Sequence, residues 1–169
     1  DIGALGGAAC RLTLAHDGFG GETATAKVVP QGWPEALSRL KTLAETGFPA
    51  DKLQIEITES SYIERENEVT PILNELKKMG VSIAIDDFGT GYSSFSYLRE
   101  MPWDCIKIDR SFITGIPRDA QQCGLVSTII KLAEVMSFKV VAEGVETGDQ
   151  LDSLTDWGCD LIQGYYFSR

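Results

Sequence analysis

Two adjacent carboxylates, Asp86 and Asp87, follow an apolar, β-branched run that is typical of a buried strand. A glycine-rich polar loop comes next, and Ser93 and Ser94 then begin a helical pattern. Neighbouring carboxylates repel each other, so a fold that keeps this pair needs a compensating charge, most simply a divalent cation. The simpler alternative is a strand-ending turn with solvated aspartates, because Asp and Gly are ordinary turn residues.

Further polar side chains stand where other predicted strands end. They are Glu56 and Glu59 after the first strand, Lys107 and Asp109 on the third, Glu143 and Glu146 after the fourth, and Gln163 on the fifth. In a parallel barrel the carboxyl ends of the strands converge on one face, so we expect these residues to meet there. So many carboxylates around one lysine require cations, and oxygen ligands favour Mg²⁺ or Mn²⁺; two such ions suit the hydrolysis of a phosphodiester. Two local alternatives stay open: a simple Lys107–Asp109 pair, and capping of the next helix by Glu143 and Glu146.

The chain from residue 33 onward alternates between predicted helices and strands. Helices are expected over residues 34–46, 60–79, 93–101, 119–137 and 147–157, and strands over 53–58, 81–86, 104–109, 138–142 and 160–163. The helix over 119–137 is expected to place Leu125, Ile129, Leu132 and Met136 on one face. The strands carry few polar residues, as parallel strands covered on both faces do. This alternation predicts an α/β fold with a parallel sheet, for which a barrel is the favoured closed form.

Length, charge and cysteine content limit the class of protein. A chain of 169 residues with 43% hydrophobic residues predicts one domain with a substantial core, and it has no apolar run long enough for a membrane span. The formal net charge of −10 argues against non-specific binding to nucleic acid or anionic lipid. Cys10, Cys105, Cys123 and Cys159 form no CxxC pair and are expected to be reduced thiols of a cytoplasmic protein. Because His16 is the only histidine, a His-based zinc site or a Ser-His-Asp triad is not expected.

Five motifs occur in one order along the chain. They are QIEITES at 54–60, DDFGTG at 86–91, IKID at 106–109, AEGVE at 142–146 and QGY at 163–165. Together they resemble the EAL-type cyclic di-GMP phosphodiesterases. The resemblance covers residues 33–169 as a partial EAL-type barrel domain and leaves residues 1–32 as a divergent segment, in which 23–29 could supply a strand. It implies an α/β fold, a modified (β/α)8 TIM-like barrel with at most six of its eight strands present here.

The resemblance also implies an activity and a set of ligands. The activity is metal-dependent hydrolysis of cyclic di-GMP to linear pGpG. The metal ligands of two Mg²⁺ or Mn²⁺ ions would be Glu56, Asp86, Asp87 and Glu143. Lys107 would hold the attacking water or a phosphate oxygen, and Gln163 would assist from the next strand, so that Lys107, Glu143 and Gln163 form the catalytic set.

Other matching positions are implied in loop anchoring and dimer contact. In this family the loop containing Phe88, Gly89, Thr90 and Gly91 links dimerisation to activity. Glu59 would anchor that loop, and Glu146 would fix the substrate-side loop or the dimer contact. The partners implied are cyclic di-GMP, a second copy of the domain, and a sensory or GGDEF-type domain in a longer protein.

Two ligands of the family have no match upstream of Glu56. The family's Glu-Ala-Leu strand lies farther upstream than the 55 residues that precede Glu56 here, and the place of a family asparagine falls near Ala24. The letters EAL at 35–37 follow Pro34 in the first turn of a predicted helix, where the helix dipole explains an acidic residue. Two alternatives to the phosphodiesterase therefore stay open. One is a catalytically degenerate module that binds cyclic di-GMP or a protein partner, and the other is a different phosphate-handling barrel enzyme.

Overall fold

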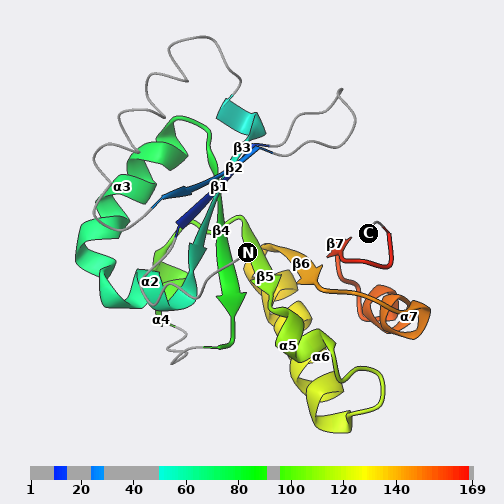
Figure 1. Cartoon of the computed structure of the whole chain (residues 1–169). Coiled ribbons are helices and arrows are strands. Elements are labelled where there is room, and N and C mark those ends of the chain that lie inside the picture. Colours follow the sequence, from blue (N-terminus) through cyan, green and yellow to red (C-terminus); the bar gives the residue numbers. More distant parts are fainter. Residues whose placement is uncertain (1–9, 15–23, 29–49, 91–95, 168–169) are drawn as a thin grey trace. The chain divides into compact units, whose positions relative to one another are not determined.

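The computed structural model describes residues 10–14, 24–28, 50–90 and 96–167 of the 169-residue chain (Figure 1). Its internal contacts divide the chain into two compact units, Asp1–Ala84 and Ile85–Arg169. The helix predicted over 34–46, the EAL letters at 35–37, His16 and Gly91 lie outside the described residues. None of the described helices is both long and apolar enough to cross a membrane.

Antiparallel strands begin the first unit. Strand β1 (Cys10–Leu14) pairs with β2 (Ala24–Val28) on one side and with β3 (Leu53–Thr58) on the other, in the order β2-β1-β3. The bounds of β3 agree with the sequence prediction, and β2 lies within the stretch 23–29 that was compatible with a strand. Strand β1 is not predicted by the sequence, because the glycine-rich residues that flank it disfavour any regular element.

Two helices follow β3, where the sequence predicts one continuous helix. A 3₁₀ turn, η2 (Ala50–Lys52), precedes β3, and the helices are α2 (Glu59–Glu64) and α3 (Glu66–Lys78). The break falls at Arg65, whose φ of −134° and ψ of 28° lie outside the helical region. The buried residues of α3, at the helical spacing of one face, are Val69, Leu73 and Leu76. Gly80, with φ +91°, follows the end of α3, a position where glycine adopts the left-handed conformation without strain.

Parallel strands organise the second unit. The strands, in the order β4-β5-β6-β7, are β4 (Ser82–Phe88), which begins in the first unit, β5 (Cys105–Ile108), β6 (Lys139–Glu143) and β7 (Leu161–Gln163). The pairs β5–β6 and β6–β7 are parallel, with Lys107 opposite Val141 and Glu143 opposite Gln163. All four residues of β5 are buried. Polar residues at the ends of these strands are therefore carried on a well-packed parallel framework.

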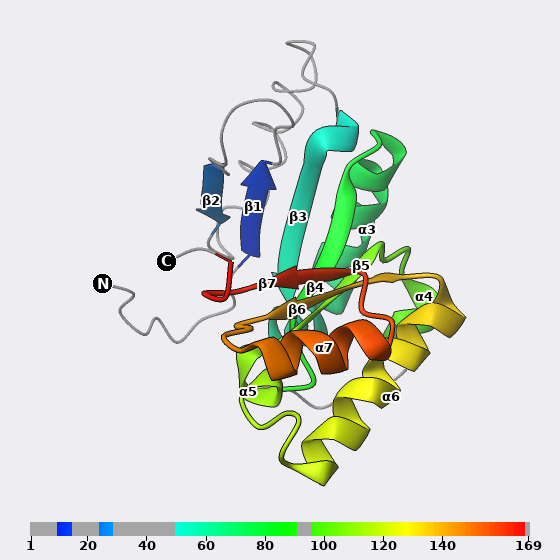
Figure 2. The same cartoon turned by 90° about the vertical axis from the view of Figure 1, so that its right-hand side faces the viewer.

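Four helices connect the strands of the second unit. They are α4 (Ser96–Glu100), α5 (Arg110–Ile113), α6 (Ala120–Met136) and α7 (Gly148–Asp156). Figure 2 shows α5, α6 and α7 on the same side of β6 and β7. Asp109, Asp119 and Thr147 each accept a hydrogen bond from a backbone N–H at the start of the helix that follows, as N-cap residues do. The bounds of α6 and α7 match the predicted helices once these capping residues are set aside.

The buried face of α6 differs from the predicted one. Its buried residues are Val126, Ile129, Ile130 and Ala133. Leu125 is 44% exposed, and Leu132 and Met136 are half-buried, so only Ile129 of the four predicted residues belongs to the core. The apolar stripe of this helix is broad, and the face that packs best is offset by one residue from the face with the largest side chains. The four residues were predicted to share one face, and the structure shows that only part of that face is buried.

Candidate functional site

The end of β4 carries the adjacent carboxylates Asp86 and Asp87. Asp86 is buried, and Asp87 adopts a left-handed conformation with φ +53°, which non-glycine residues rarely do. The Thr90 hydroxyl donates a hydrogen bond of 2.8 Å to the Asp87 carbonyl, and Gly89 has φ +92°. A Cβ on Gly89 would lie 3.1 Å from the ring of Phe112. This turn is thus built to hold two carboxylates side by side at a strand end.

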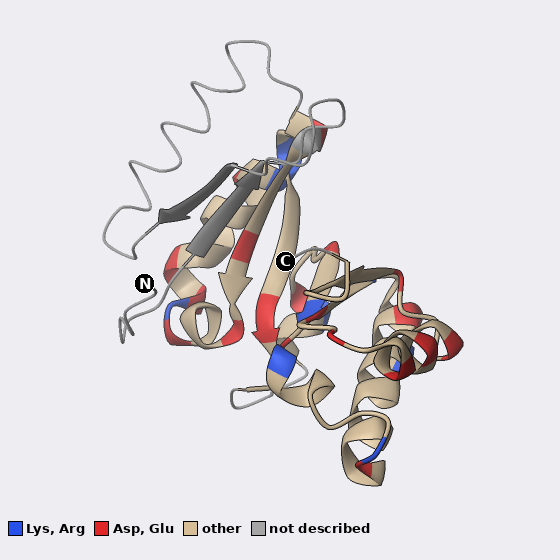
Figure 3. Cartoon of the chain, turned by 45° about the vertical axis from the view of Figure 1, so that its right-hand side comes forward, with Lys and Arg blue, Asp and Glu red and all other residues tan. Residues whose placement is uncertain are grey.

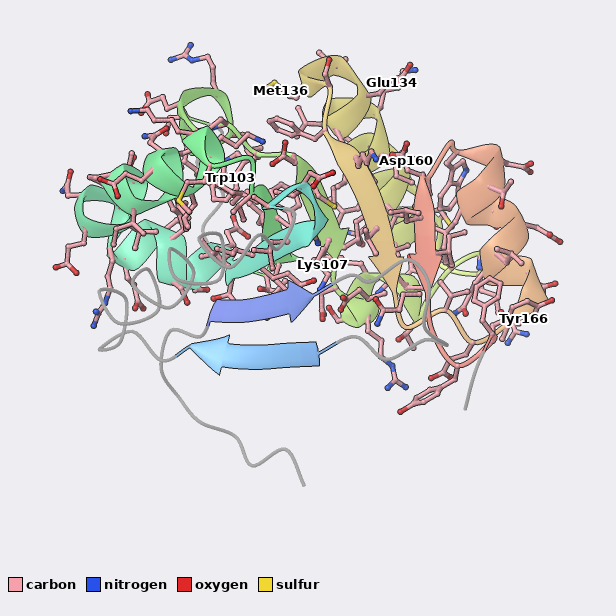
Figure 4. The ribbon with its side chains drawn as sticks, turned by 90° about the horizontal axis from the view of Figure 1, so that it is seen from above. Trp103, Lys107, Glu134, Met136, Asp160 and Tyr166 are labelled. Carbon is pink, nitrogen blue, oxygen red and sulfur yellow. The ribbon has the colours of Figure 1, made fainter. Side chains whose placement is uncertain are left out.

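Lys107, on the neighbouring strand β5, is a buried cation, with only 3% of its surface exposed. Its ammonium nitrogen lies 3.1 Å from Oδ1 of Asp86 and 2.6 Å from Oε1 of Glu143, at the end of β6. Figure 3 shows acidic residues, in red, at the end of β4, and Figure 4 labels the side chain of Lys107. One ammonium therefore joins carboxylates from two other strands, as the convergence of strand ends predicts.

Asp87 completes a concentration of negative charge. The pKa of its carboxyl is raised to about 6, first by burial and then by the carboxylates of Asp86, Asp109 and Glu143 in that order, against a lowering effect of Lys107. A carboxylate surrounded by others gains least from ionising, because like charges repel. The raised pKa of Asp87 thus indicates that Asp86, Asp87, Asp109 and Glu143 lie near one another.

The sequence left two local alternatives open: a simple Lys107–Asp109 pair, and capping of the next helix by Glu143 and Glu146. The structure contradicts both. Asp109 accepts a hydrogen bond of 2.9 Å from the backbone N–H of Ser111 and so caps α5, whereas the ion pairs of Lys107 are with Asp86 and Glu143. Helix α7 is capped by Thr147 together with Gln150. The side chains of Glu143 and Glu146 therefore do not cap α7.

Glu146 forms an ion pair with Arg110, whose Nη2 lies 2.8 Å from its Oε1. Both side chains are exposed, at 58% for Arg110 and 44% for Glu146. The stem of Arg110 passes over Gly144, where an added Cβ would lie 2.4 Å from its Cγ. Gln163, on β7, is exposed, and its backbone carbonyl accepts from the N–H of Val145 at 3.1 Å. The predicted residues Glu143, Glu146 and Gln163 therefore belong to connected segments at the ends of β6 and β7.

Glu56 and Glu59 lie in the first unit and are both buried, with 5% and 1% of their surface exposed. Glu56 is on β3, and Glu59 is the first residue of α2, where a negative charge is favoured by the helix dipole. Burial of a carboxylate in a strand suits a ligand, but the membership of Glu56 in the site of the second unit stays a prediction. The anchoring role of Glu59 also stays a prediction.

The residues of the second unit suit a hard divalent cation by their chemistry, since they offer carboxylate oxygens at one place. Within the ranges 10–14, 24–28, 50–90 and 96–167, no three His, Cys, Asp or Glu side chains lie close enough together to hold a metal ion. The ammonium of Lys107 lies within ion-pair distance of both Asp86 and Glu143. A cation bound there would have to take over these contacts.

Two residues of this region, Arg110 and Gln150, are not among those predicted from the sequence. Arg110 follows the IKID motif directly, but a single exposed arginine has no diagnostic pattern. Gln150 stands three residues after Thr147, and this spacing of a capping box could have identified it. In the structure Gln150 is buried and bonds to three backbone groups.

A parallel α/β sheet whose strand ends carry clustered carboxylates and a buried lysine defines an acidic, barrel-type active-site framework. The EAL domain family matches residues 29–169 of this sequence. The chain belongs to the EAL domain family. Its predicted fold class is confirmed, as an EAL-type, barrel-like α/β fold that is present in part, with five parallel strands out of the predicted maximum of six.

Named relatives share the motif-bearing part of the chain. The "Cyclic di-GMP phosphodiesterase NbdA" of Pseudomonas aeruginosa is 46% identical over 127 residues, which cover 75% of this chain and 16% of that protein. The "Oxygen sensor protein DosP" of Escherichia coli is 40% identical over 123 residues, covering 73% and 15%. This chain thus spans less than a fifth of the length of these relatives.

Solved structures of cyclic di-GMP complexes are also similar to this chain. The structure described as "PaMucR Phosphodiesterase, c-di-GMP complex" has a TM-score of 0.75 and 39% identity, covering 83% of this chain and 56% of that one. The "Klebsiella pneumoniae BlrP1 pH 6 manganese/cy-diGMP complex" has a TM-score of 0.74 and 35% identity, covering 80% and 35%. Both of these family members were solved with cyclic di-GMP, and the second also with manganese.

Proposed function

We propose that this chain is part of a phosphodiesterase domain that hydrolyses cyclic di-GMP to linear pGpG and depends on Mg²⁺ or Mn²⁺. The observation that carries the proposal is the buried ammonium of Lys107 between Asp86 and Glu143, beside Asp87. A site of this charge and composition suits a bound cation and a phosphate group. The relatives that act on or bind cyclic di-GMP supply the substrate class.

The acidic residues would hold the cations. Asp86, Asp87 and Glu143 would be ligands in the second unit, joined by Glu56 from β3, for two ions. Bound ions would activate water and stabilise charge on the attacking and leaving oxygens of the phosphodiester. The carboxylates would contribute by binding the positive ions at a position that is already partly shielded from water.

Lys107 and Gln163 would act on the substrate side. The N–H groups of Lys107 would donate to a phosphate oxygen or to the attacking water when Asp86 and Glu143 serve as metal ligands. The burial of Lys107 makes such a hydrogen bond stronger than it would be in water. Gln163 lies opposite Glu143 in the sheet register and is exposed, so its amide can donate to the same ligand.

Regulation would involve the loop after β4 and a second copy of the domain. The strained turn at Asp87–Thr90 supplies a segment whose conformation would report on dimer contacts, with Glu59 and Glu146 as its anchors. We also propose that the full protein carries a sensory or GGDEF-type domain. The names of two relatives, "Bifunctional diguanylate cyclase/cyclic di-GMP phosphodiesterase MucR" and "Oxygen sensor protein DosP", support this proposal.

A second candidate function is binding of cyclic di-GMP or a protein partner without turnover. It is favoured by the lack of a three-ligand acidic group among the residues that the structure describes. In that case the Lys107 ammonium would keep its two carboxylates and would act as the permanent counter-ion of the site.

One experiment separates these functions. The chain is incubated with cyclic di-GMP with and without Mn²⁺, pGpG is measured by chromatography, and nucleotide binding is measured by calorimetry on the same sample. Mn²⁺-dependent pGpG that disappears in Asp86→Asn supports the phosphodiesterase. Binding without product from a folded chain supports the second candidate, and a folded chain that neither binds nor hydrolyses cyclic di-GMP refutes the phosphodiesterase and the nucleotide-binding form of the second candidate.

A further inference from the structure

Gln150, near the start of α7, has a buried side chain whose polar atoms all bond to backbone groups. Its Oε1 accepts from the N–H of Glu146 at 2.9 Å and from the N–H of Thr147 at 3.1 Å. Its Nε2 donates to the carbonyl of Ile113, at the end of α5, at 3.0 Å. Only 6% of the residue is exposed. Gln150 therefore bridges the segment after β6 to the helix after β5.

Capping explains only part of this arrangement. In a capping box the side chain three positions after the N-cap needs only an acceptor for the N-cap N–H, so glutamate serves as well as glutamine. Here the bond from Nε2 to Ile113 joins two helices and requires a donor, which glutamate lacks. The glutamine thus has a function beyond starting α7.

The segment between Glu143 and Gln150 is fixed at several successive residues. Gly144 adopts φ +75° beneath the stem of Arg110, and the N–H of Val145 donates to the Gln163 carbonyl. Glu146 is held by Arg110 through its side chain and by Gln150 through its backbone. Because the backbone of this segment is held at successive residues, a displacement at Gln150 would be transmitted back along the segment to Glu143.

We infer that Gln150 is a positioning residue for Glu143: its bridge to Ile113 sets where the Glu143 carboxylate meets Lys107. The bridge and the ion pair connect the same two strands. Ile113 follows β5, which carries Lys107, and Gln150 follows β6, which ends at Glu143. The ion pair of 2.6 Å between Lys107 and Glu143 depends on that register. The catalytic consequence of this inference rests on the proposed phosphodiesterase function, whereas the positioning itself does not.

The test of positioning is a double-mutant cycle in metal-free protein. The melting temperature is measured in EDTA for the wild type, Glu143→Gln, Gln150→Met and the double variant. Gln150→Met keeps the side-chain length and removes every side-chain hydrogen bond. If Gln150 positions Glu143, the loss of melting temperature caused by Glu143→Gln should be smaller by about 3 °C in the Gln150→Met background, as expected for coupled residues in a chain of this size.

Thr147→Val is the matched control. It removes the capping bond from the Gln150 N–H to Thr147 Oγ1, 3.3 Å long, but leaves the bridge to Ile113. Its effect should add to that of Glu143→Gln within about 1.5 °C. Equal losses from Glu143→Gln in the wild-type and Gln150→Met backgrounds would overturn the inference, and so would non-additivity of the same size in Thr147→Val. Should Gln150→Met not fold, Gln150→Asn takes its place, because its amide is one methylene too short to reach Ile113.

The activity assay separates this inference from the proposed function. With Mn²⁺ present, Gln150→Met should lower kcat for cyclic di-GMP about tenfold with little change in KM, as loss of a residue that orients a metal ligand does. Thr147→Val should keep kcat within about twofold. A wild-type chain that forms no pGpG refutes the proposed function, while the melting-temperature cycle still decides whether Gln150 positions Glu143.

Discussion

Replacing Lys107 with methionine removes the one ammonium that joins Asp86 to Glu143. The three side chains are 4%, 11% and 22% exposed in that order, and the two N···O distances are 3.1 and 2.6 Å. Removing one partner of a buried ion pair costs about 3–5 kcal/mol, because the remaining charge stays desolvated. Glu143 can regain some water, so we expect the lower figure, about 3 kcal/mol, which corresponds to roughly 6–12 °C of melting temperature in a chain of 169 residues.

Lys131 provides a control at the same distance. Its ammonium lies 2.6 Å from Oε2 of Glu134, but these side chains are 73% and 68% exposed, and Figure 4 labels Glu134 at the edge of the view. An exposed pair contributes about 0–1 kcal/mol, so Lys131→Met should lower the melting temperature by no more than about 4 °C. Both variants are unfolded by heat and by urea in EDTA at the same ionic strength.

Mn²⁺ adds a second arm to this comparison. A divalent cation can replace the lost positive charge of Lys107, so saturating Mn²⁺ should raise the melting temperature of Lys107→Met more than that of the wild type. Binding at 100 times the dissociation constant stabilises a folded protein by about 2.7 kcal/mol, which is close to the expected loss. The reasoning is refuted if Lys107→Met loses no more stability than Lys131→Met, or if Mn²⁺ stabilises the wild type and Lys107→Met equally.

Three further predictions concern single residues. The pKa of Asp87 is raised to about 6, so the folded state binds the proton more tightly than the unfolded state, and this contribution to stability is lost as the pH rises from about 4 to 6. Between about pH 4 and 6, the free energy of unfolding should therefore fall by about 1 kcal/mol less in Asp87→Asn than in the wild type, after allowance for solvent screening. An equal fall in both proteins would contradict this. Burial raises the pKa of Cys159 to about 11, so its alkylation by iodoacetamide, followed by mass spectrometry, should keep accelerating up to about pH 11, and a plateau near pH 8.5 would contradict it. Gly144→Ala should cost at least about 1 kcal/mol more in urea unfolding than Gly158→Ala. Both positions are left-handed, but the new Cβ would meet Arg110 only at Gly144, so equal costs would exclude the steric explanation.

Local chemistry made much of the fold predictable from the sequence. Strand β3, the caps at Asp119 and Thr147 and the helix stop at Gly80 follow from side-chain patterns within a few residues. Strand β1 could not be predicted in the same way, because its place depends in part on pairing with β3, which lies far along the chain. The buried face of α6 also depends on what packs against it rather than on its own sequence.

The candidate site shows the same division. Which strand ends carry acidic residues is visible in the sequence, and the parallel topology brings Asp86, Lys107 and Glu143 together as predicted. The partners of Lys107 were not predictable from the sequence. Asp109 is the nearest carboxylate along the chain, only two residues after Lys107, but in the structure it caps the helix that follows. The bridge from Gln150 to Ile113 likewise depends on how two separate helices are placed.

The charge of the site favours a cation over a permanent Lys107 counter-ion. Asp86, Asp87 and Glu143 carry three negative charges when ionised, and Lys107 supplies one positive charge. Asp109 also raises the pKa of Asp87, so the acidic side chains near this position outnumber the one ammonium. Like charges gathered in a partly desolvated place repel each other unless positive charge is added, and a divalent cation supplies charge of the required sign. The raised pKa of Asp87 is therefore in keeping with the proposed cation site, where a bound ion would offset the repulsion among these carboxylates.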